Sequence, residues 1–325
     1  MIWLDAGTPA LLGLDWGSSS LRAWLMDARG IILHVHYARQ GILNLPDGGF
    51  AQVLSDILTQ LRLEYPLPML ACGMVGSING WLEVPYLPCP AAMSQLANGL
   101  GLQSTAYGPL HIVPGLVKDG PLPDVMRGEE TQIVGMMGTD GAGHRTVVLP
   151  GTHSKWAQVE EQAITDFRTF MTGELYAVLM QHSILGRLPA TMPPDAGQRD
   201  EAFVMGVRTA LSGVPLAGRL FSARAAVLRN RLERACAADY LSGLLIGEEI
   251  QVGMTAMDIT PQAAPVLVGE QALCQRYQLA FTALGHHAPP VAGNTAPAGL
   301  FRLAQAAHLL DLPPTHFHDQ KGAVA

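Results

Sequence analysis

The sequence predicts an α/β protein of two lobes, each with a mixed sheet flanked by helices. Three observations support this fold class. The chain has 325 residues, of which 49% are hydrophobic and only 14% charged, and this is enough for two substantial cores. Its first segments follow strand and helix periodicities in a β-β-β-α-β order. A turn rich in glycine and hydroxyl side chains occurs early in the chain and again near its middle, which indicates a duplicated architecture.

The first of these turns lies within Leu11–Arg22. An apolar strand ends at Asp15, and Gly17 permits a tight return into the alternating segment Leu21–Met26. Phosphate oxygens can be bound by the backbone N–H groups and hydroxyls of the turn residues Gly17, Ser18, Ser19 and Ser20. Asp15 can hold Mg²⁺ through water, because magnesium prefers carboxylates and keeps most of its water shell. Sequences of this kind also form ordinary turns without a ligand.

The rest of the first lobe follows from periodicity. A third strand is predicted at 31–38, a helix on one face of the sheet at 50–63, and a further strand at 68–72. The segment Gly73–Ala91 is too rich in Gly and Pro for a regular element, and it follows a strand, where binding loops tend to lie. Met74, Ser77 and Trp81 suit a polyol substrate. The alternative is a buried structural loop with Trp81 and Tyr86 in the core.

The segment Pro114–Asp124 is rich in turn residues and predicts a hinge, so that the lobes comprise residues 1–120 and 121–325. After it, Gly128 precedes two glutamates and an apolar helical pattern. Acidic residues are favourable in a first helical turn, so capping alone can explain Glu129 and Glu130. The functional interpretation is that one of them is a general base of the second lobe.

The second glycine and hydroxyl turn joins two strands predicted at 146–149 and 155–159. It offers Gly151, Thr152 and His153, so the two hairpins can hold a polyphosphate from opposite sides. Residues 264–268 predict a strand, and Gly269 then opens a helix whose first amides suit an adenosine or α-phosphate. The helical stretch Arg199–Met257 exceeds this minimal plan; core packing is its favoured use, and a homodimer interface is the alternative.

Charge and apolar patterning exclude several classes of function. The net charge is −7 and no block of Lys or Arg occurs, which argues against a nucleic-acid partner. Apolar runs fall short of the ~20 residues of a membrane helix, and the start lacks the pattern of a signal peptide, so we expect a cytoplasmic protein without membrane contact. The four cysteines show no metal-binding spacing, and reduced core thiols are expected.

Three segments resemble the motifs of the actin-like ATPase superfamily. LGLDWGSSSLR is similar to its first phosphate motif, VVLPGTHSKW to its second, and VLVGEQALCQRY to its adenosine motif. The resemblance implies a ribonuclease H-like fold in each lobe, with ATP bound in the cleft between them. It also implies adenosine contacts at Gly269 and Glu270.

Within the superfamily the chain resembles the 2-dehydro-3-deoxygalactonokinase family over nearly its whole length, in ACGMVGSINGWLEVPYLPCPA, DVMRGEETQIVG and FRTFMTGELYAVLMQHSIL among others. This implies ATP- and Mg²⁺-dependent phosphorylation of O6 of 2-dehydro-3-deoxy-D-galactonate in galactonate catabolism. RGEETQIVG also resembles the G-D-Q segment of glycerol and xylulose kinases, in which the Asp after Gly is the base. By position that role falls on Glu129, but the change from Asp to Glu leaves Glu130 open.

The substrate implied by the resemblance carries a carboxylate, which requires a cation. Arg22, Arg127 and Lys155 are the basic residues within the motifs, and we expect Arg127 to bind the carboxylate because a guanidinium can pair with it through two parallel hydrogen bonds. Two alternatives remain: a related sugar or sugar-acid kinase, and a non-catalytic, nucleotide-gated sensor of the same fold.

Overall fold

The chain divides into two compact units in the computed structural model. Unit 1 comprises residues 1–142, 160–166 and 295–325, and unit 2 comprises residues 143–159 and 167–294. The structure describes residues 7–63, 66–137, 144–187, 194–260 and 264–311. The first six residues, at which the sequence predicts no signal peptide, lie outside these ranges. Within the described ranges no helix has both the length and the apolar character needed to span a bilayer.

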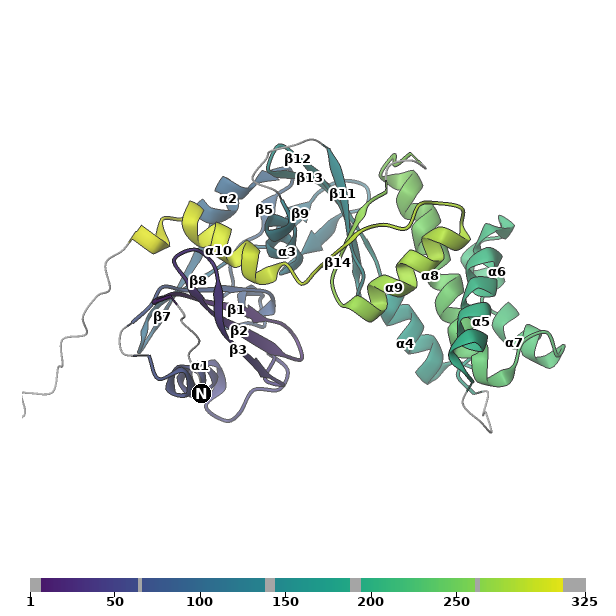
Figure 1. The fold of residues 1–325 in the computed structure, drawn as a ribbon, viewed down its shortest axis with the longest axis horizontal. Coiled ribbons are helices and arrows are strands. Elements are labelled where there is room, and N and C mark those ends of the chain that lie inside the picture. Colours follow the sequence, from purple (N-terminus) through teal and green to yellow (C-terminus); the bar gives the residue numbers. More distant parts are fainter. Residues whose placement is uncertain (1–6, 64–65, 138–143, 188–193, 261–263, 312–325) are drawn as a thin grey trace, which may run out of the picture. The chain divides into compact units, whose positions relative to one another are not determined.

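Unit 1 is built around a six-stranded mixed sheet with the order β3-β2-β1-β4-β8-β7 (Figure 1). A smaller sheet has the order β10-β9-β5, and β6 pairs with the start of β13. The strands of the unit are β1 (Pro9–Trp16), β2 (Leu21–Asp27), β3 (Ile32–Ala38), β4 (Met69–Cys72), β5 (Leu87–Pro88), β6 (Ala91–Ala92), β7 (Gly101–Thr105), β8 (Gly108–Ile112), β9 (Leu116–Lys118) and β10 (Asp124–Met126). The helices are α1 (Gly49–Leu61), the 3₁₀ turn η1 (Met74–Gly76), α2 (Met93–Asn98), α3 (Glu129–Met136), α10 (Ala296–Ala306) and η4 (Leu309–Asp311).

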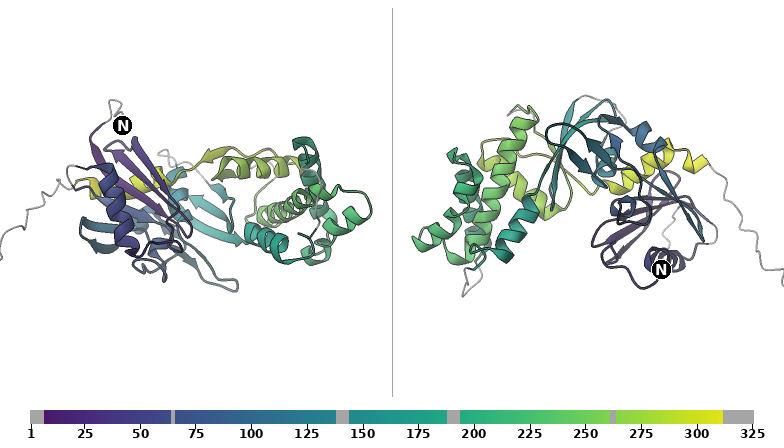
Figure 2. Two further views of the ribbon diagram at one scale, coloured as in Figure 1. Left: turned by 90° about the horizontal axis from the view of Figure 1, so that it is seen from below. Right: turned by 180° about the vertical axis from the view of Figure 1, so that it is seen from behind.

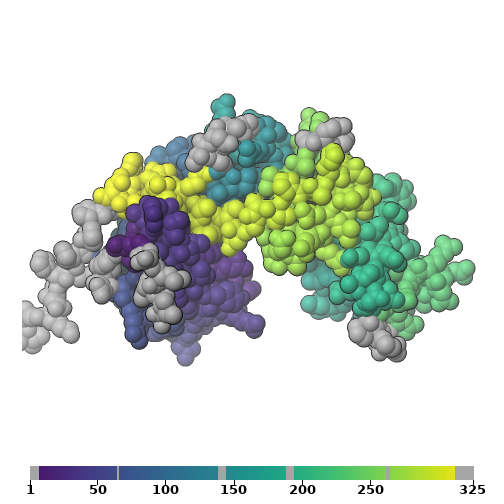
Figure 3. Space-filling view, viewed as in Figure 1, coloured from purple at the N-terminus to yellow at the C-terminus, as the bar shows by residue number. Residues whose placement is uncertain are grey.

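Alternation along β1 assigns its two faces to different helices. Leu12 and Leu14 are fully buried in a cluster with the apolar face of α1. Gly13 points the other way, where an added Cβ would lie 3.1 Å from Leu300 of α10. The views in Figures 1 and 2 accordingly show α1 on one face of the sheet, and Figure 3 shows α10 against the first strands. The C-terminal helix therefore completes the N-terminal core.

Unit 2 contains the sheet order β15-β14-β11-β12-β13 and most of the helices (Figure 1). Its strands are β11 (Arg145–Leu149), β12 (Ser154–Glu160), β13 (Ala163–Phe170), β14 (Val266–Val268) and β15 (Val291–Gly293). The first residues of β13 and the last residue of β12 belong to unit 1. The helices are α4 (Thr172–His182), α5 (Ala196–Thr209), η2 (Ala210–Ser212), α6 (Leu216–Arg219), α7 (Ser222–Leu228), η3 (Arg234–Cys236), α8 (Ala237–Ala256) and α9 (Gln271–Ala283).

The two main sheets repeat one plan, which confirms the predicted duplication. In unit 1 the antiparallel β1–β2 hairpin is followed by β4 and β8, which run parallel to β1. In unit 2 the antiparallel β11–β12 hairpin is followed by β14 and β15, which run parallel to β11. The residue after β4 is Gly73 (φ 92°) and the residue after β14 is Gly269 (φ 145°). A backbone that favours glycine thus follows the equivalent strand in each sheet.

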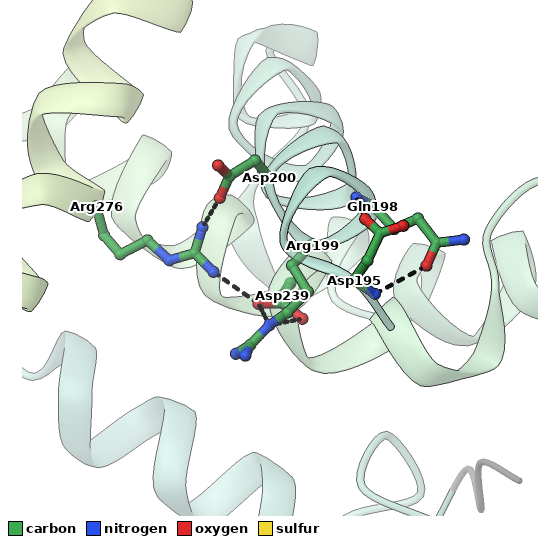
Figure 4. A network of polar contacts seen from close by, with 6 residues as sticks. All are labelled: Asp195, Gln198, Arg199, Asp200, Asp239 and Arg276. Atoms are coloured by element: carbon green, nitrogen blue, oxygen red, sulfur yellow. Dashed lines mark hydrogen bonds and ion pairs between the residues drawn. The ribbon is translucent and has the colours of Figure 1, made fainter. Parts of the chain in front are cut away.

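The long helical stretch packs within unit 2. Glycines at the crossing of α5 and α8, Gly206 and Gly243, bring the two backbones into close contact. Beside this crossing, Asp239 accepts hydrogen bonds from Arg199 (3.2 Å) and Arg276 (2.8 Å), so that α5, α8 and α9 are joined by ion pairs (Figure 4). The predicted use of this stretch in core packing is confirmed.

Two predictions about the middle of the chain are wrong. Residues 114–124 do not form a hinge, because β9 and the start of β10 lie within them and pair with each other inside unit 1. The predicted division at residues 120 and 121 also differs from the units observed. Helix α3 belongs to unit 1, and α10 returns to it, because these helices pack against each other and α10 packs on β1. The two glutamates therefore share a unit with Asp15.

The four cysteines are all described and all free, and three of them are buried. Their thiols occupy core or near-core positions, as the sequence predicts.

Candidate active-site residues

Asp15 stands at the end of β1, where strand register places it between Arg22 of β2 and Cys72 of β4. Burial raises its pKa to about 6; the Arg22 charge opposes this shift and the Glu129 charge adds to it. Gly73 packs closely against this strand end, because a Cβ there would lie 2.8 Å from the carbonyl oxygen of Trp16 and 3.4 Å from Asp15 Oδ1.

Helix α3 begins directly beside Gly73. A Cβ on Gly128 would come within 3.2 Å of the Gly73 Cα, and Gly128 has φ 108°, so both the contact and the backbone favour glycine. This close approach brings the first turn of α3 to the end of β4. The charge of Glu129 consequently acts on Asp15, and the charges of Glu129 and Glu130 act on Cys72.

The two glutamates occupy different environments. Glu130 is fully buried; its Oε2 accepts from Gly128 N (2.6 Å) and its Oε1 from the Thr131 hydroxyl (3.0 Å). Burial, followed by the neighbouring Glu129 charge, raises the pKa of Glu130 to about 7. Glu129 is partly exposed, and its Oε2 accepts from Arg127 N at 3.1 Å. Of the two carboxylates, Glu129 is therefore the more exposed.

Arg127 is 9% exposed and has unsatisfied donors. Its Nη2 donates to Val84 O (2.6 Å), and the guanidinium carbon lies 4.2 Å from the centre of the Tyr86 ring. Its Nε and Nη1 are buried without a hydrogen-bond partner. Since Nη2 uses one of its two hydrogens, one edge of the guanidinium still offers two parallel N–H groups. This is the donor arrangement that a carboxylate accepts.

The predicted first phosphate turn, residues 17–20, is hydrogen-bonded to the segment that follows β3. Ile42 N donates to Gly17 O and Leu43 N to Ser18 O, each at 3.0 Å. Gly41 allows this approach, because a side chain there would collide with the Ser18 backbone. The side chains of Ser18 and Ser19 are exposed. The turn therefore has a fixed backbone and hydroxyls that face solvent.

The three residues predicted to bind a polyol, Met74, Ser77 and Trp81, have different surroundings. Ser77 donates its hydroxyl to Met74 O (2.7 Å) within the 3₁₀ turn after β4. Trp81 packs on the core of unit 1, stacked on Phe50 (5.5 Å between ring centres) and edge-on to Trp16. It also lines a cavity of about 560 Å³ with the start of α1 and residues 103–107. Trp81 thus has the core contacts of the alternative interpretation.

The predicted second phosphate turn, residues 150–153, lies between β11 and β12 and packs against the start of α4. Glu174 N donates to Thr152 O (3.0 Å), and His153 Nε2 lies in hydrogen-bond contact with the Glu174 carboxylate. Beside it, Lys155 is 5% exposed and donates to the Thr169 hydroxyl (2.5 Å). Thr152 and His153 are exposed, and a Cβ on Gly151 would meet no atom within 4 Å, so the outer surface of the turn is open.

A buried polar network behind this turn was not foreseen from the sequence. Glu249 of α8 is 2% exposed and accepts from Trp156 Nε1 (2.8 Å) and from the Tyr277 hydroxyl (2.7 Å). Ser154 lies 3.0 Å from the same Tyr277 oxygen. The one signal in the sequence is the acidic pair Glu248 and Glu249 in the middle of a largely apolar helix.

The adenosine candidates lie beside the second turn. A Cβ on Gly269 would be 3.8 Å from the carbonyl oxygen of Pro150. Glu270 is the N-cap of α9 and accepts from Leu273 N (3.0 Å); this hydrogen bond and one from Ala272 N lower its pKa. Unit 2 therefore brings Gly151, Thr152, His153 and Gly269 together, and unit 1 brings Asp15, Glu129 and Glu130 together.

Comparison with known proteins gives a consistent result over most of the chain. The family model of 2-keto-3-deoxy-galactonokinase matches residues 15–303. The 2-dehydro-3-deoxygalactonokinase of Escherichia coli (strain K12) is 39% identical over 302 residues, which cover 92% of this chain and 99% of the relative. A relative from Rhizobium meliloti (strain 1021) that carries the same enzyme name is 35% identical, over 90% of this chain and 96% of its own.

A solved structure supports the same assignment. The crystal structure of a Sinorhizobium meliloti protein, described under the same enzyme name, superposes with a TM-score of 0.82. It is 33% identical and covers 91% of this chain and 98% of its own. Sequence and fold therefore agree over most of the chain.

Proposed function

We propose that this chain, which belongs to the 2-keto-3-deoxy-galactonokinase family, transfers the γ-phosphoryl group of ATP to O6 of 2-dehydro-3-deoxy-D-galactonate, releasing ADP. The observation that carries the proposal is the placement of Glu129 beside Asp15, in a chain that matches the family from residue 15 to residue 303. Phosphoryl transfer to a hydroxyl requires a carboxylate at the attacking O–H and charge neutralisation at the phosphates. A cytoplasmic location suits an enzyme that consumes ATP.

Glu129 is assigned as the group that accepts or orients the hydroxyl proton. Its Oε2 is held by Arg127 N, so the carboxylate has a defined direction. Glu130 is unsuited to this role, because it is fully buried and both of its oxygens already accept hydrogen bonds. Its part is to hold the first turn of α3, through Gly128 N, in the position that Glu129 needs.

Arg127 is assigned to the substrate carboxylate. An unpaired buried N–H group costs on the order of 1–3 kcal/mol, so an anion that reaches Nε or Nη1 recovers a penalty already present. The Tyr86 ring covers the guanidinium and is 39% exposed, and the paired donors at the guanidinium edge remain for a carboxylate. A neutral sugar would leave the positive charge and the two donors unsatisfied.

The phosphate and nucleotide contacts are assigned to the two turns and to the start of α9. Unit 1 contributes Asp15 and the turn of Gly17, Ser18, Ser19 and Ser20. Unit 2 contributes Gly151, Thr152 and His153, with Gly269 and Glu270 at the adenosine. These assignments are supported by the open outer surface at Gly151 and by the exposed hydroxyls of the first turn.

The donor set of unit 1 fits magnesium. Hard carboxylate oxygens suit this ion, and Asp15 can hold it through water. In the described part of the chain no group of three or more His, Cys, Asp or Glu side chains is arranged to hold a metal, so the ion would keep most of its water ligands. When bound it would neutralise phosphate charge, while Asp15 fixes its water shell.

The test is a coupled ADP-release assay over a panel of sugar acids with and without the 2-keto and 3-deoxy groups, and with both configurations at C4. Turnover is expected with 2-dehydro-3-deoxy-D-galactonate and ATP. Turnover confined to another acid would replace the substrate and keep the reaction. Binding of ATP without turnover on any acid would overturn the kinase assignment in favour of a nucleotide-gated sensor.

A further inference from the structure

We propose that the buried carboxylate of Glu249 is a positioning residue for ATP, because it fixes the second phosphate turn through Ser154 and Tyr277. The proposal rests on the proposed function, which assigns that turn to the phosphates. Glu249 touches no proposed ligand itself. It acts through the hydroxyl groups that meet at its two oxygens.

Glu249 is the acceptor at the centre of the network. Its Oε1 accepts from Trp156 Nε1 at 2.8 Å and its Oε2 from the Tyr277 hydroxyl at 2.7 Å. The hydroxyls of Thr172 and Ser154 also hydrogen-bond to it, and all of these contacts stabilise the ionised form against the burial that raises its pKa. The groups that meet the carboxylate are therefore all donors.

This arrangement favours one direction for each hydroxyl. The Tyr277 hydroxyl donates to Glu249 Oε2 and presents its oxygen lone pairs to Ser154, 3.0 Å away. The Ser154 hydroxyl can donate to Tyr277 at 3.0 Å, to Glu249, or to Gly151 O at the longer distance of 3.5 Å, so the network offers it the shorter contact. The Ser154 oxygen is the acceptor for Gly151 N at 3.3 Å. The buried charge thereby orders the first residue of the phosphate turn.

The same carboxylate joins three elements that adjoin the predicted nucleotide contacts. Ser154 and Trp156 belong to the strand that follows the turn. Thr172 opens α4, which holds the turn through the hydrogen bond from Glu174 N to Thr152 O. Tyr277 lies on α9, the helix that starts after Gly269 and Glu270. A change at Glu249 is thus transmitted to the phosphate turn and the adenosine helix together.

Burial makes the network rigid. Ser154, Trp156 and Tyr277 are between 0% and 1% exposed. Gly253, one turn beyond Glu249 on α8, faces the Trp156 ring, from which a Cβ would be only 2.6 Å away. With no space for alternative rotamers, the hydroxyls have one hydrogen-bonding pattern, which is the condition for positioning a turn.

Tyr277→Phe is the principal test, because it removes one hydroxyl and keeps the ring that packs in the core. We expect the dissociation constant for ATP, measured by titration calorimetry on the full chain, to rise about 5- to 30-fold, the scale of one or two lost buried hydrogen bonds. The KM for the sugar acid is expected to change less than twofold. Glu249→Gln is also expected to raise the dissociation constant for ATP. Its amide NH₂ would face the donor groups of Trp156 and Tyr277, which need an acceptor.

Asp239→Asn is the matched control. Asp239 is also a buried carboxylate on α8, 7% exposed, but its partners are Arg199 and Arg276 rather than the turn (Figure 4). We expect it to lower the melting temperature while ATP affinity stays within twofold. If all three variants lose ATP affinity in proportion to their loss of stability, Glu249 is merely structural and the proposal is wrong.

The outcomes separate this inference from the proposed function. Should the unaltered protein fail to bind ATP, both fall. Should it bind ATP while Tyr277→Phe binds equally well, only the positioning role falls. If Glu249→Gln does not fold, Tyr277→Phe and Ser154→Ala still test the positioning role. Each of them removes only a neutral hydroxyl and no charged side chain.

Discussion

Gly173 of α4 lies against Gly151 of the second phosphate turn: a Cβ on Gly173 would be 2.5 Å from the Gly151 carbonyl oxygen and 2.8 Å from the Thr152 Cα. Helix α4 and the turn that carries proposed ATP contacts therefore pack backbone against backbone at this point. The absence of a side chain at Gly173 determines where the turn lies.

Gly173→Ala is expected to displace the turn and lower kcat/KM for ATP about 10- to 100-fold, the scale of a misplacement near 1 Å. Steady-state kinetics with varied ATP measure this. Gly197→Ala is the matched control, because Gly197 is likewise the second residue of its helix, α5, and is exposed. Alanine there should leave the kinetics unchanged. Equal losses in the two variants would show that the Gly173 contact is irrelevant to ATP.

Glu129→Gln is expected to lower kcat by roughly 10²–10⁴-fold while ATP affinity stays near normal, since a general base contributes on that scale. Glu130→Gln should lower kcat less than Glu129→Gln does, because the Glu130 side chain acts only through its hold on the first turn of α3. Single-turnover measurements on both variants compare the chemical step directly. A Glu129→Gln enzyme with near-normal kcat would transfer the role to Glu130.

Glu130 makes stability depend on pH in a defined direction. Burial raises its pKa from 4.5 to about 7, so the folded state holds the proton more tightly than the unfolded state. The stabilisation is fully present below about pH 4.5 and is lost as pH rises through about 7. Relative to Glu130→Gln, the unaltered protein should therefore lose roughly 1–3 kcal/mol of unfolding free energy between pH 5 and pH 8.

Urea unfolding of both proteins at pH 5 and pH 8 measures this difference. The control is Glu201→Gln, an exposed carboxylate on α5, for which the difference from the unaltered protein should not change with pH. A Glu130→Gln difference that is constant with pH would mean that Glu130 is ionised throughout.

Arg127→Ala is expected to raise KM for the sugar acid about 10- to 100-fold, with KM for ATP changed less than threefold, because charge-assisted hydrogen bonds contribute about 1.5–3 kcal/mol. Arg127→Lys should recover little of this loss, since an ammonium does not reproduce the planar pair of N–H groups. Kinetics with each substrate varied in turn provide the comparison. Equal losses for acid and ATP would mark Arg127 as structural.

Much of the fold was predictable from local patterns. The β1–β2 and β11–β12 hairpins, α1, α3 and the strand before Gly269 were all predicted, because each depends on periodicity and turn chemistry over a few neighbouring residues. The duplicated plan was also readable, since the same turn chemistry occurs twice. Sequence reasoning likewise selected the pair of glutamates at the start of a helix.

What the sequence by itself determined is the set of elements and the candidate residues at their ends. The tertiary structure alone decided that α3 and α10 belong to unit 1. It also decided that Glu130 is buried while Glu129 is partly exposed. The contact of Glu249 with Ser154 through Tyr277 likewise exists only in the folded chain. Burial and hydrogen-bond partners arise between residues far apart in the chain; Ser154 and Tyr277 are separated by 123 positions. No local pattern encodes such a contact, because its energy depends on the packing of whole helices and sheets.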